Sequence, residues 1–387
     1  MKTILKMLGG LLAGIAFGVL IGIGGAVVFN GVGISEAFTK VFSGGTLRLL
    51  VPVFWAALWA VVSFFLQIVI HEGGHLVAGL LTGYRFVSFR ILEFTLIKKD
   101  GRYQWRRYAL ASTGGQCLMA PPLRPLSEID TRWYNAGGVL ANIIVSTITL
   151  LLLLFFEMPE WAGIFLLMMT FVGYLLALIN GIPLKIGGMN NDGRNLLFLE
   201  KSPEDKRILC RMLEANALIQ EGVQPKDLPD EMFAEDESAD WHDGLQTNWQ
   251  LTTITRMINR HQWEEAYMRI HEAMAEKEHL IQLFRLELGV ELVFVCLATG
   301  RKDEARECCT KELRKYVSQF KETHSSKQRL LFAVALLLDD NREEALAILN
   351  KVKAHRNDYA LQGEVDMDIE LMEHLLSVEL RVESVEV

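Results

Sequence analysis

The chain has 387 residues, 51% of them hydrophobic, and its formal net charge is −8 at pH 7. Its mean hydropathy is +0.22, but the first half is membrane-like while the second half is charged and acidic. The length allows more than one domain. The acidic balance argues against a nucleic-acid partner. The five cysteines form no C-x-x-C pair and no disulfide spacing, which favours a reducing compartment.

Four apolar runs predict about four transmembrane helices, because about 20 apolar residues span a bilayer. The first, in residues 1–30, resembles a signal peptide, but its apolar run is longer than usual and lacks a clear cleavage signal. The second, from about Arg48 to Thr82, is longer than a bilayer requires, so its last turns should leave the hydrocarbon or lie inside the protein. The third and fourth runs are Trp133–Phe156 and Trp161–Ile182.

The second run carries the sequence His71-Glu72-Gly73-Gly74-His75, the H-E-x-x-H pattern of zinc hydrolases. Histidines four residues apart lie on one face of a helix, where two imidazoles can hold one Zn²⁺ at about 2.0–2.1 Å each. Glu72 can take a proton from the attacking water. The alternative is a pair of histidines at a membrane interface without a metal. A charged cluster at the end of a membrane helix is costly unless it has a function, which favours the metal.

Residues 84–110 alternate apolar and polar side chains around a turn at Lys98-Lys99-Asp100-Gly101, which predicts a membrane-associated β-hairpin. Residues 112–129 are rich in glycine and proline, so we expect a loop there. A hairpin directly after the zinc helix could pair with an extended substrate strand. A purely structural hairpin is an equally good interpretation.

The distribution of basic residues predicts the orientation in the membrane. Nine lysines and arginines lie between the second and third runs, and none lies between the third and fourth. Lys2 and Lys6 also favour a cytoplasmic N-terminus. Four spans then place the zinc motif, the hairpin and the C-terminus on the cytoplasmic side. We expect an integral membrane protein, and the compact membrane part suggests a bacterial cell membrane.

The remainder of the chain is expected to be soluble and helical. Residues 201–248 read as a helix followed by an acidic linker, and residues 249–387 as a cytoplasmic helical domain. Three motifs recur about every 40 residues, and each opens an amphipathic helix: Trp263-Glu264-Glu265-Ala266, Lys302-Asp303-Glu304-Ala305 and Arg342-Glu343-Glu344-Ala345. This pattern resembles tetratricopeptide repeats, which usually bind proteins, so a cytosolic protein partner is possible. A plain helical bundle is the alternative.

A catalytic zinc needs a third protein ligand, and Asp192 is the candidate. It follows the fourth apolar run in the sequence Asn190-Asn191-Asp192-Gly193, just past a helix antiparallel to the zinc helix. This places Asp192 at the membrane depth of His71 and His75. Asp-Gly is also a common turn dipeptide. The matched depth favours the ligand.

With these residues the chain resembles the site-2 protease family of intramembrane zinc metalloproteases. Besides the zinc motif, the resemblance is carried by residues 136–142 early in the third run and by Asn180-x-x-Pro183 leading to Asp192-Gly193. It implies that His71, His75 and Asp192 are zinc ligands, that Glu72 is the general base, and that Asn142 and Asn180 contact substrate in the cleft. The chain departs from the family pattern in having Val139 in place of proline, a longer segment before Asp192, and Asn191 in place of leucine.

The sequence therefore predicts a mainly α, polytopic membrane protein: a first transmembrane helix in residues 1–30, a metalloprotease core in 48–200, a helix and linker in 201–248, and a helical-repeat domain in 249–387. We expect it to hydrolyse a membrane-embedded peptide or single-span protein, such as a regulator or a signal peptide. A membrane-anchored repeat scaffold with a non-catalytic metal site is the second hypothesis, but an intact Glu72 argues against it. A transporter is the third, and the membrane part has no internal repeat to support it.

Overall fold

The computed structural model describes residues 33, 35–36, 46–99, 101–107, 114–233 and 240–386. Within these ranges three helices are long and apolar enough to cross a membrane, over Phe54–Leu81, Leu126–Phe155 and Glu160–Gly181. They belong to α3 (Thr46–Leu81), α4 (Arg132–Phe155) and α5 (Glu160–Gly181). The transmembrane helix predicted in residues 1–30 lies outside the described residues.

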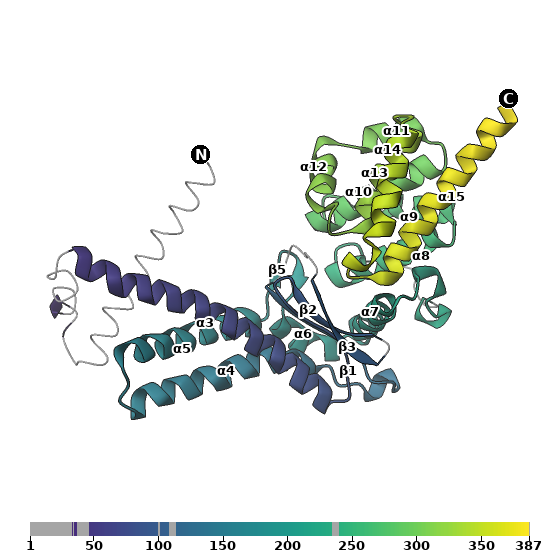
Figure 1. Ribbon diagram of the computed structural model, residues 1–387. Coiled ribbons are helices and arrows are strands. Elements are labelled where there is room, and N and C mark those ends of the chain that lie inside the picture. Colours follow the sequence, from purple (N-terminus) through teal and green to yellow (C-terminus); the bar gives the residue numbers. More distant parts are fainter. Residues whose placement is uncertain are drawn as a thin grey trace. The chain divides into compact units, whose positions relative to one another are not determined.

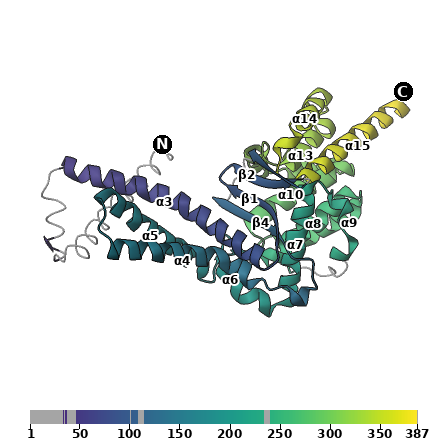
Figure 2. The same cartoon turned by 60° about the horizontal axis from the view of Figure 1, so that its bottom comes forward.

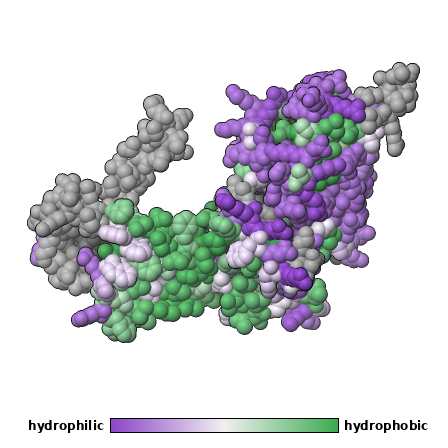
Figure 3. Space-filling view, in the orientation of Figure 1, coloured by the Kyte–Doolittle hydropathy of each residue, from purple (hydrophilic) through white to green (hydrophobic). Residues whose placement is uncertain are grey.

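Tertiary contacts divide the chain into two compact units. The first contains residues up to Gly74 together with Gly138–Asn180, which are most of the three apolar helices. The α4–α5 connection lies at the same end of this unit as the N-terminus of α3 (Figures 1 and 2). Gly74, Gly138 and Asn180 consequently share the opposite end. Hydrophobic residues cover the visible faces of the three helices in Figure 3, as expected for surfaces in contact with lipid.

The second unit contains His75–Gly137 and Gly181–Val387. Gly83 ends α3 in a left-handed conformation (φ +89°), and Tyr84 N donates to Gly79 O at 2.9 Å. This helix stop turns the chain into the first strand of a sheet. The strands are β1 (Arg85–Ile91), β2 (Phe94–Lys99), β3 (Arg102–Arg107) and β4 (Gly115–Ala120), paired antiparallel in the order β3-β2-β1-β4.

The predicted hairpin is therefore part of a larger sheet, and the loop predicted for residues 112–129 is wrong where β4 forms. The sequence Gly115-Gln116-Cys117-Leu118-Met119-Ala120 was obscured by the glycines and prolines around it. It forms a strand because β1 pairs with it from Arg85↔Ala120 to Ile91↔Gly115. Cys117, Met119 and Ala120 are buried, so tertiary packing outweighs the local turn signals.

A small hairpin leads from α5 to Asp192. Its strands are β5 (Lys185–Ile186) and β6 (Met189–Asn190), and it is followed by the short helix α6 (Asp192–Phe198). This hairpin is the extra length that distinguishes the chain from the family pattern. Gly187 and Gly188 form its turn with φ values of +60° and +88°, a conformation that favours glycine.

The rest of the second unit is helical, and the face seen in Figure 3 is mostly hydrophilic. Its longer helices are α7 (Pro203–Glu221), α8 (Gly244–Asn259), α9 (Trp263–Ala275), α10 (Gln282–Ala298), α11 (Lys302–Cys308), α12 (Lys311–Phe320), α13 (Ser325–Leu337), α14 (Arg342–Ala354) and α15 (Gln362–Glu386).

The three recurring motifs of the sequence begin α9, α11 and α14, and each follows another helix of the domain. Their alanines, Ala266, Ala305 and Ala345, are all 0% exposed. A small residue here allows the paired helices to approach closely. The assignment of these helix pairs to the tetratricopeptide family stays a prediction.

Candidate metal centre

His71 and His75 lie one turn apart near the C-terminal end of α3 and are 9% and 8% exposed. Metal-binding histidines usually donate a hydrogen bond from one ring nitrogen to an oxygen, which leaves the other nitrogen free to bind the metal. Both histidines make such a contact through Nδ1. His71 Nδ1 is 2.7 Å from Asn142 Oδ1, and His75 Nδ1 is 2.7 Å from the backbone oxygen of Tyr134.

A chain of buried hydrogen bonds across α3, α4 and α5 fixes the His71 tautomer. Gln67 Nε2 donates to Met169 O at 2.8 Å, and Asn142 Nδ2 donates to Gln67 Oε1 at 2.7 Å and to Gln67 O at 2.9 Å. Backbone carbonyls only accept, so both amide orientations follow from the network. Asn142 Oδ1 must then accept from His71 Nδ1, so in the neutral ring Nε2 is the unprotonated nitrogen, the one that can bind a metal.

This network exists because α5 approaches the other two helices closely at Gly173. A Cβ atom there would lie 2.0 Å from Ser146 Oγ and 2.4 Å from Gln67 Nε2. Small residues allow this kind of approach between membrane helices, and a buried polar side chain needs it in order to find a partner. Asn142 and Gln67 are both 0% exposed.

The His75 contact is supported by packing between α3, β4 and the start of α4. The Tyr134 hydroxyl donates to Cys117 O at 2.8 Å, and the Tyr134 ring stacks on Tyr84 with 4.9 Å between centroids. Gly79, one turn after His75, has no room for a side chain, because a Cβ atom would lie 2.3 Å from Met119 Sδ. The sheet is thus held against the helix that carries the histidines.

Asp192 is the first residue of α6, and Asn191 fixes its position. Asn191 Oδ1 accepts from Leu184 N and from Arg194 N, each at 3.0 Å, and its Nδ2 donates to Ile182 O at 2.7 Å. One side chain therefore closes the base of the β5–β6 hairpin and caps α6. This explains why asparagine can stand where the family pattern has leucine: the longer segment needs a cap.

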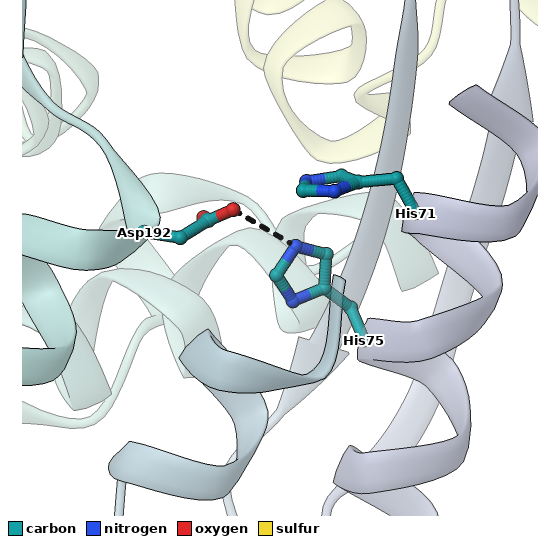
Figure 4. A group of neighbouring side chains, drawn as sticks. All are labelled: His71, His75 and Asp192. Carbon is teal, nitrogen blue, oxygen red and sulfur yellow. Dashed lines mark ion pairs between the residues drawn. The ribbon is translucent and has the colours of Figure 1, made fainter. Parts of the chain in front are cut away.

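The carboxylate of Asp192 faces the histidines (Figure 4). Its Oδ2 is 3.4 Å from His75 Nε2, and one ligand atom from each of His71, His75 and Asp192 lies within 4.8 Å of the other two. Two ligands on a tetrahedral zinc, each about 2.1 Å from the ion, lie about 3.4 Å apart. Two imidazoles with a carboxylate are a donor set that suits Zn²⁺ and leaves a position open for water.

The other residues predicted for the site lie in different surroundings. Glu72 follows His71 on α3 and is half-buried. Asn180, near the end of α5, donates from Nδ2 to Leu176 O at 3.0 Å, one turn back on its own helix. Asn142 contacts His71, so in this structure it supports a histidine. The substrate contacts expected of Asn142 and Asn180 stay predictions.

Sequence reasoning missed Gln67, Tyr134 and Asn191 as parts of the site. Gln67 gave a signal, because it is a polar residue inside a membrane span and lies one turn before His71 on the same helix face. Tyr134 acts through its backbone oxygen, which no residue pattern reports.

Comparison with known proteins identifies the family. The model of peptidase family M50 matches residues 59–338, well over half of the chain and including every residue of the site. No curated protein and no solved structure matches the chain. M50 peptidases are membrane metalloproteases that use zinc, in agreement with the apolar helices and the His-His-Asp group. The chain therefore belongs to peptidase family M50, the family of the site-2 proteases.

Proposed function

We propose that the protein is an intramembrane zinc endopeptidase that hydrolyses a peptide bond of a membrane-embedded substrate near the cytoplasmic side. The observation that carries this proposal is the group of two buried histidines, His71 and His75, with the half-buried Asp192 at the end of the apolar helices, and with Glu72 on the same helical turn as His71. A metal site used only for structure would have no need for a base beside it.

The residues divide the reaction among them. His71, His75 and Asp192 would hold the zinc, which when bound would polarise a peptide carbonyl and acidify a water molecule. Glu72 takes a proton from the water as its oxygen attacks the carbonyl carbon. The same carboxyl group then delivers the proton to the amine as the C–N bond breaks, giving a carboxylic acid and an amine. Gln67 and Asn142 hold the His71 ring in the orientation that presents Nε2.

The surroundings of the site support the proposed substrate class. A single-span protein or a leftover signal peptide brings its peptide bonds to the depth of α3, but a helical substrate must unwind first. β3 is an edge strand, and Tyr103 and Trp105, which lie on one of its faces, are 63% and 70% exposed. An edge strand with exposed aromatic residues is suited to hold an extended peptide by backbone pairing.

The orientation and the partners are also part of the proposal. The basic residues between α3 and α4, and their absence between α4 and α5, favour a cytoplasmic position for the site and the C-terminal helices. We propose that residues 249–387 bind a cytosolic protein and that the protein resides in a bacterial cell membrane.

A comparison of the wild type with Glu72→Gln tests the function. Both proteins, purified in detergent, should contain zinc, and only the wild type should cleave single-span peptides reconstituted with it. The expected loss is at least about 100-fold, the contribution of a general base. Zinc in both proteins with equal cleavage would show that Glu72 is not the general base. Zinc in both with no cleavage by either would favour the scaffold hypothesis.

A further inference from the structure

A second cluster of metal-ligating side chains lies in the C-terminal helical part of the chain. One ligand atom from each of His242, Glu276 and His279 lies within 4.8 Å of the other two. His242 precedes α8, whereas Glu276 and His279 lie in the turn between α9 and α10. No residue of the cluster belongs to the His71–His75–Asp192 group.

The arrangement of these three side chains fits ligands around one ion better than it fits a simple ion pair. His242 Nε2 is 3.7 Å from Glu276 Oε2, and the rings of His242 and His279 are 4.2 Å apart between centroids with 31° between their planes. An ion pair between His242 and Glu276 would explain the first contact but not the second ring. Two neighbouring imidazoles would repel each other if both were protonated, whereas one shared cation uses a lone pair from each.

The backbone at both ends of the cluster is fixed. His242 stands between Trp241, which is 5% exposed, and Asp243, which caps α8 by accepting from Leu245 N and Gln246 N. In the other turn, His279 N donates to Glu276 O at 2.9 Å, and the next residue, Leu280, is 7% exposed. The backbone that carries these side chains is thus held in place before an ion binds. Because the side chains of His242 and Glu276 are 56% and 48% exposed, an ion can enter directly from solvent.

The same two turns hold the β5–β6 hairpin. Lys185 Nζ is 3.5 Å from Asp243 Oδ2. A Cβ atom on Gly188 would lie 2.4 Å from Ile281 Cδ1, and one on Gly244 would lie 3.0 Å from Gly188 O, so the hairpin turn is in close contact with the Ile281 side chain and with the start of α8. Asp243 is adjacent to His242, and Ile281 follows His279 by two residues. The hairpin that they hold leads directly to Asn191 and Asp192.

We propose that His242, Glu276 and His279 form a second metal site, for a divalent transition ion such as Zn²⁺, on the turns that hold the β5–β6 hairpin. Two imidazoles and a carboxylate suit zinc, and solvent supplies the remaining position. Binding links the loop before α8 to the α9–α10 turn and so restrains the segment before Asp192. Metal binding at this second site does not require that the protein be a protease.

The test counts zinc in the full-length chain, without a histidine tag, in detergent micelles. A variant with His71→Ala and His75→Ala lacks the membrane ligands, and we expect it to keep one zinc ion per chain. Adding His242→Ala and His279→Ala should remove that ion or weaken its binding more than about 100-fold, since even loss of a ligand's supporting residue costs 10–100-fold. The control adds His271→Ala and His355→Ala instead. These histidines each pair with one carboxylate, Glu304 at 3.0 Å and Asp358 at 2.9 Å, and the control should keep the ion.

Three further readouts complete the test. In the otherwise intact chain, His242→Ala with His279→Ala should lower the zinc content from two ions to one, which does not require the membrane ligands to be removed. Glu276→Gln should weaken the second ion while the thermal unfolding midpoint of the metal-free protein stays unchanged. In the His71→Ala/His75→Ala chain, added zinc should slow hydrogen exchange at residues 185–190.

Two results would overturn the proposal. One is failure of the His71→Ala/His75→Ala chain to bind zinc although it unfolds cooperatively, and the other is zinc binding that survives loss of His242 and His279. Neither result would bear on the function of Glu72.

Discussion

At the scale of single residues, the candidate metal centre depends on side chains outside its three candidate ligands. The Nδ1 contacts of His71 and His75 decide which ring nitrogen can bind, and they come from an amide on α4 and a backbone oxygen at its start. Asn142 in turn depends on Gln67, and Asp192 depends on Asn191. The geometry of the three candidate ligands is therefore set by a second layer of hydrogen bonds.

Gln67→Leu tests this dependence, because leucine removes both amide contacts while keeping a similar volume. We expect zinc affinity to fall by about 10–100-fold, as is typical when the partner of a ligating histidine is lost. The affinity is measured by competition with a chelator in a chain that carries His242→Ala and His279→Ala, so that only the membrane site is counted.

Ser63→Ala is the matched control, because Ser63 is also 0% exposed and lies one turn earlier on α3. It should leave zinc affinity unchanged. If Gln67→Leu bound zinc as tightly as this control, the hydrogen-bond chain would have no part in holding His71.

At the scale of secondary-structure elements, β3 is where substrate pairing is proposed. Successive amides of an antiparallel strand point to opposite sides, so of Gln104 and Trp105 one directs its N–H away from β2. Proline is tolerated at such an outward position of an edge strand. Gln104→Pro and Trp105→Pro, made separately, should include one folded variant that retains zinc and cleaves several-fold more slowly. If every variant that stays folded and keeps zinc cleaved at the wild-type rate, the sheet would have a structural role only.

The buried ion pair that joins α13 and α15 gives the helical part a dependence on pH. Asp368 and Arg329 are both 0% exposed, and Arg329 Nη1 is 3.0 Å from Asp368 Oδ1. Burial raises the pKa of Asp368 from 3.8 to about 6, against the opposing effect of Arg329. At a pH between these two pKa values the folded state therefore binds more protons than the unfolded state. The contribution of Asp368 to the free energy of unfolding consequently falls as the pH rises from about 4 to about 6.

Asp368→Asn removes this titration. From pH 4 to pH 7 the free energy of unfolding of the variant should improve relative to the wild type by about 3 kcal/mol, the equivalent of the change in pKa. Denaturant unfolding of the full chain in detergent at both pH values measures it. Asp303→Asn makes the same charge change at a side chain that is 97% exposed and should show little pH-dependent difference. A difference between Asp368→Asn and the wild type that does not vary with pH would contradict this explanation.

At the scale of the whole molecule, the sequence predicts what depends on composition and periodicity. The apolar runs at 48–82, 133–156 and 161–182 correspond to α3, α4 and α5, and the three recurring motifs begin helices. The proximity of Asp192 to the histidines followed from matched membrane depth, because antiparallel helices return the chain to the same level.

What the sequence did not predict depends on contacts between distant residues. β4 forms because β1 is available to pair with it, although its own neighbours are glycines and prolines. α12 and α15 lie in stretches where no motif repeats. The hydrogen bonds of Gln67 to Asn142 and Met169 join residues 75 and 102 positions apart, and a single sequence gives no measure of such pairs.

X-ray absorption at the zinc edge tests the central claim most directly, on a chain with His242→Ala and His279→Ala. We predict one ion per chain with only nitrogen and oxygen ligands at about 2.0–2.2 Å, two of them imidazoles, and loss of this ion in the same chain carrying Asp192→Ala. A sulfur ligand near 2.3 Å, or the same spectrum and zinc content after Asp192→Ala, would contradict the assignment of His71, His75 and Asp192 as the metal centre.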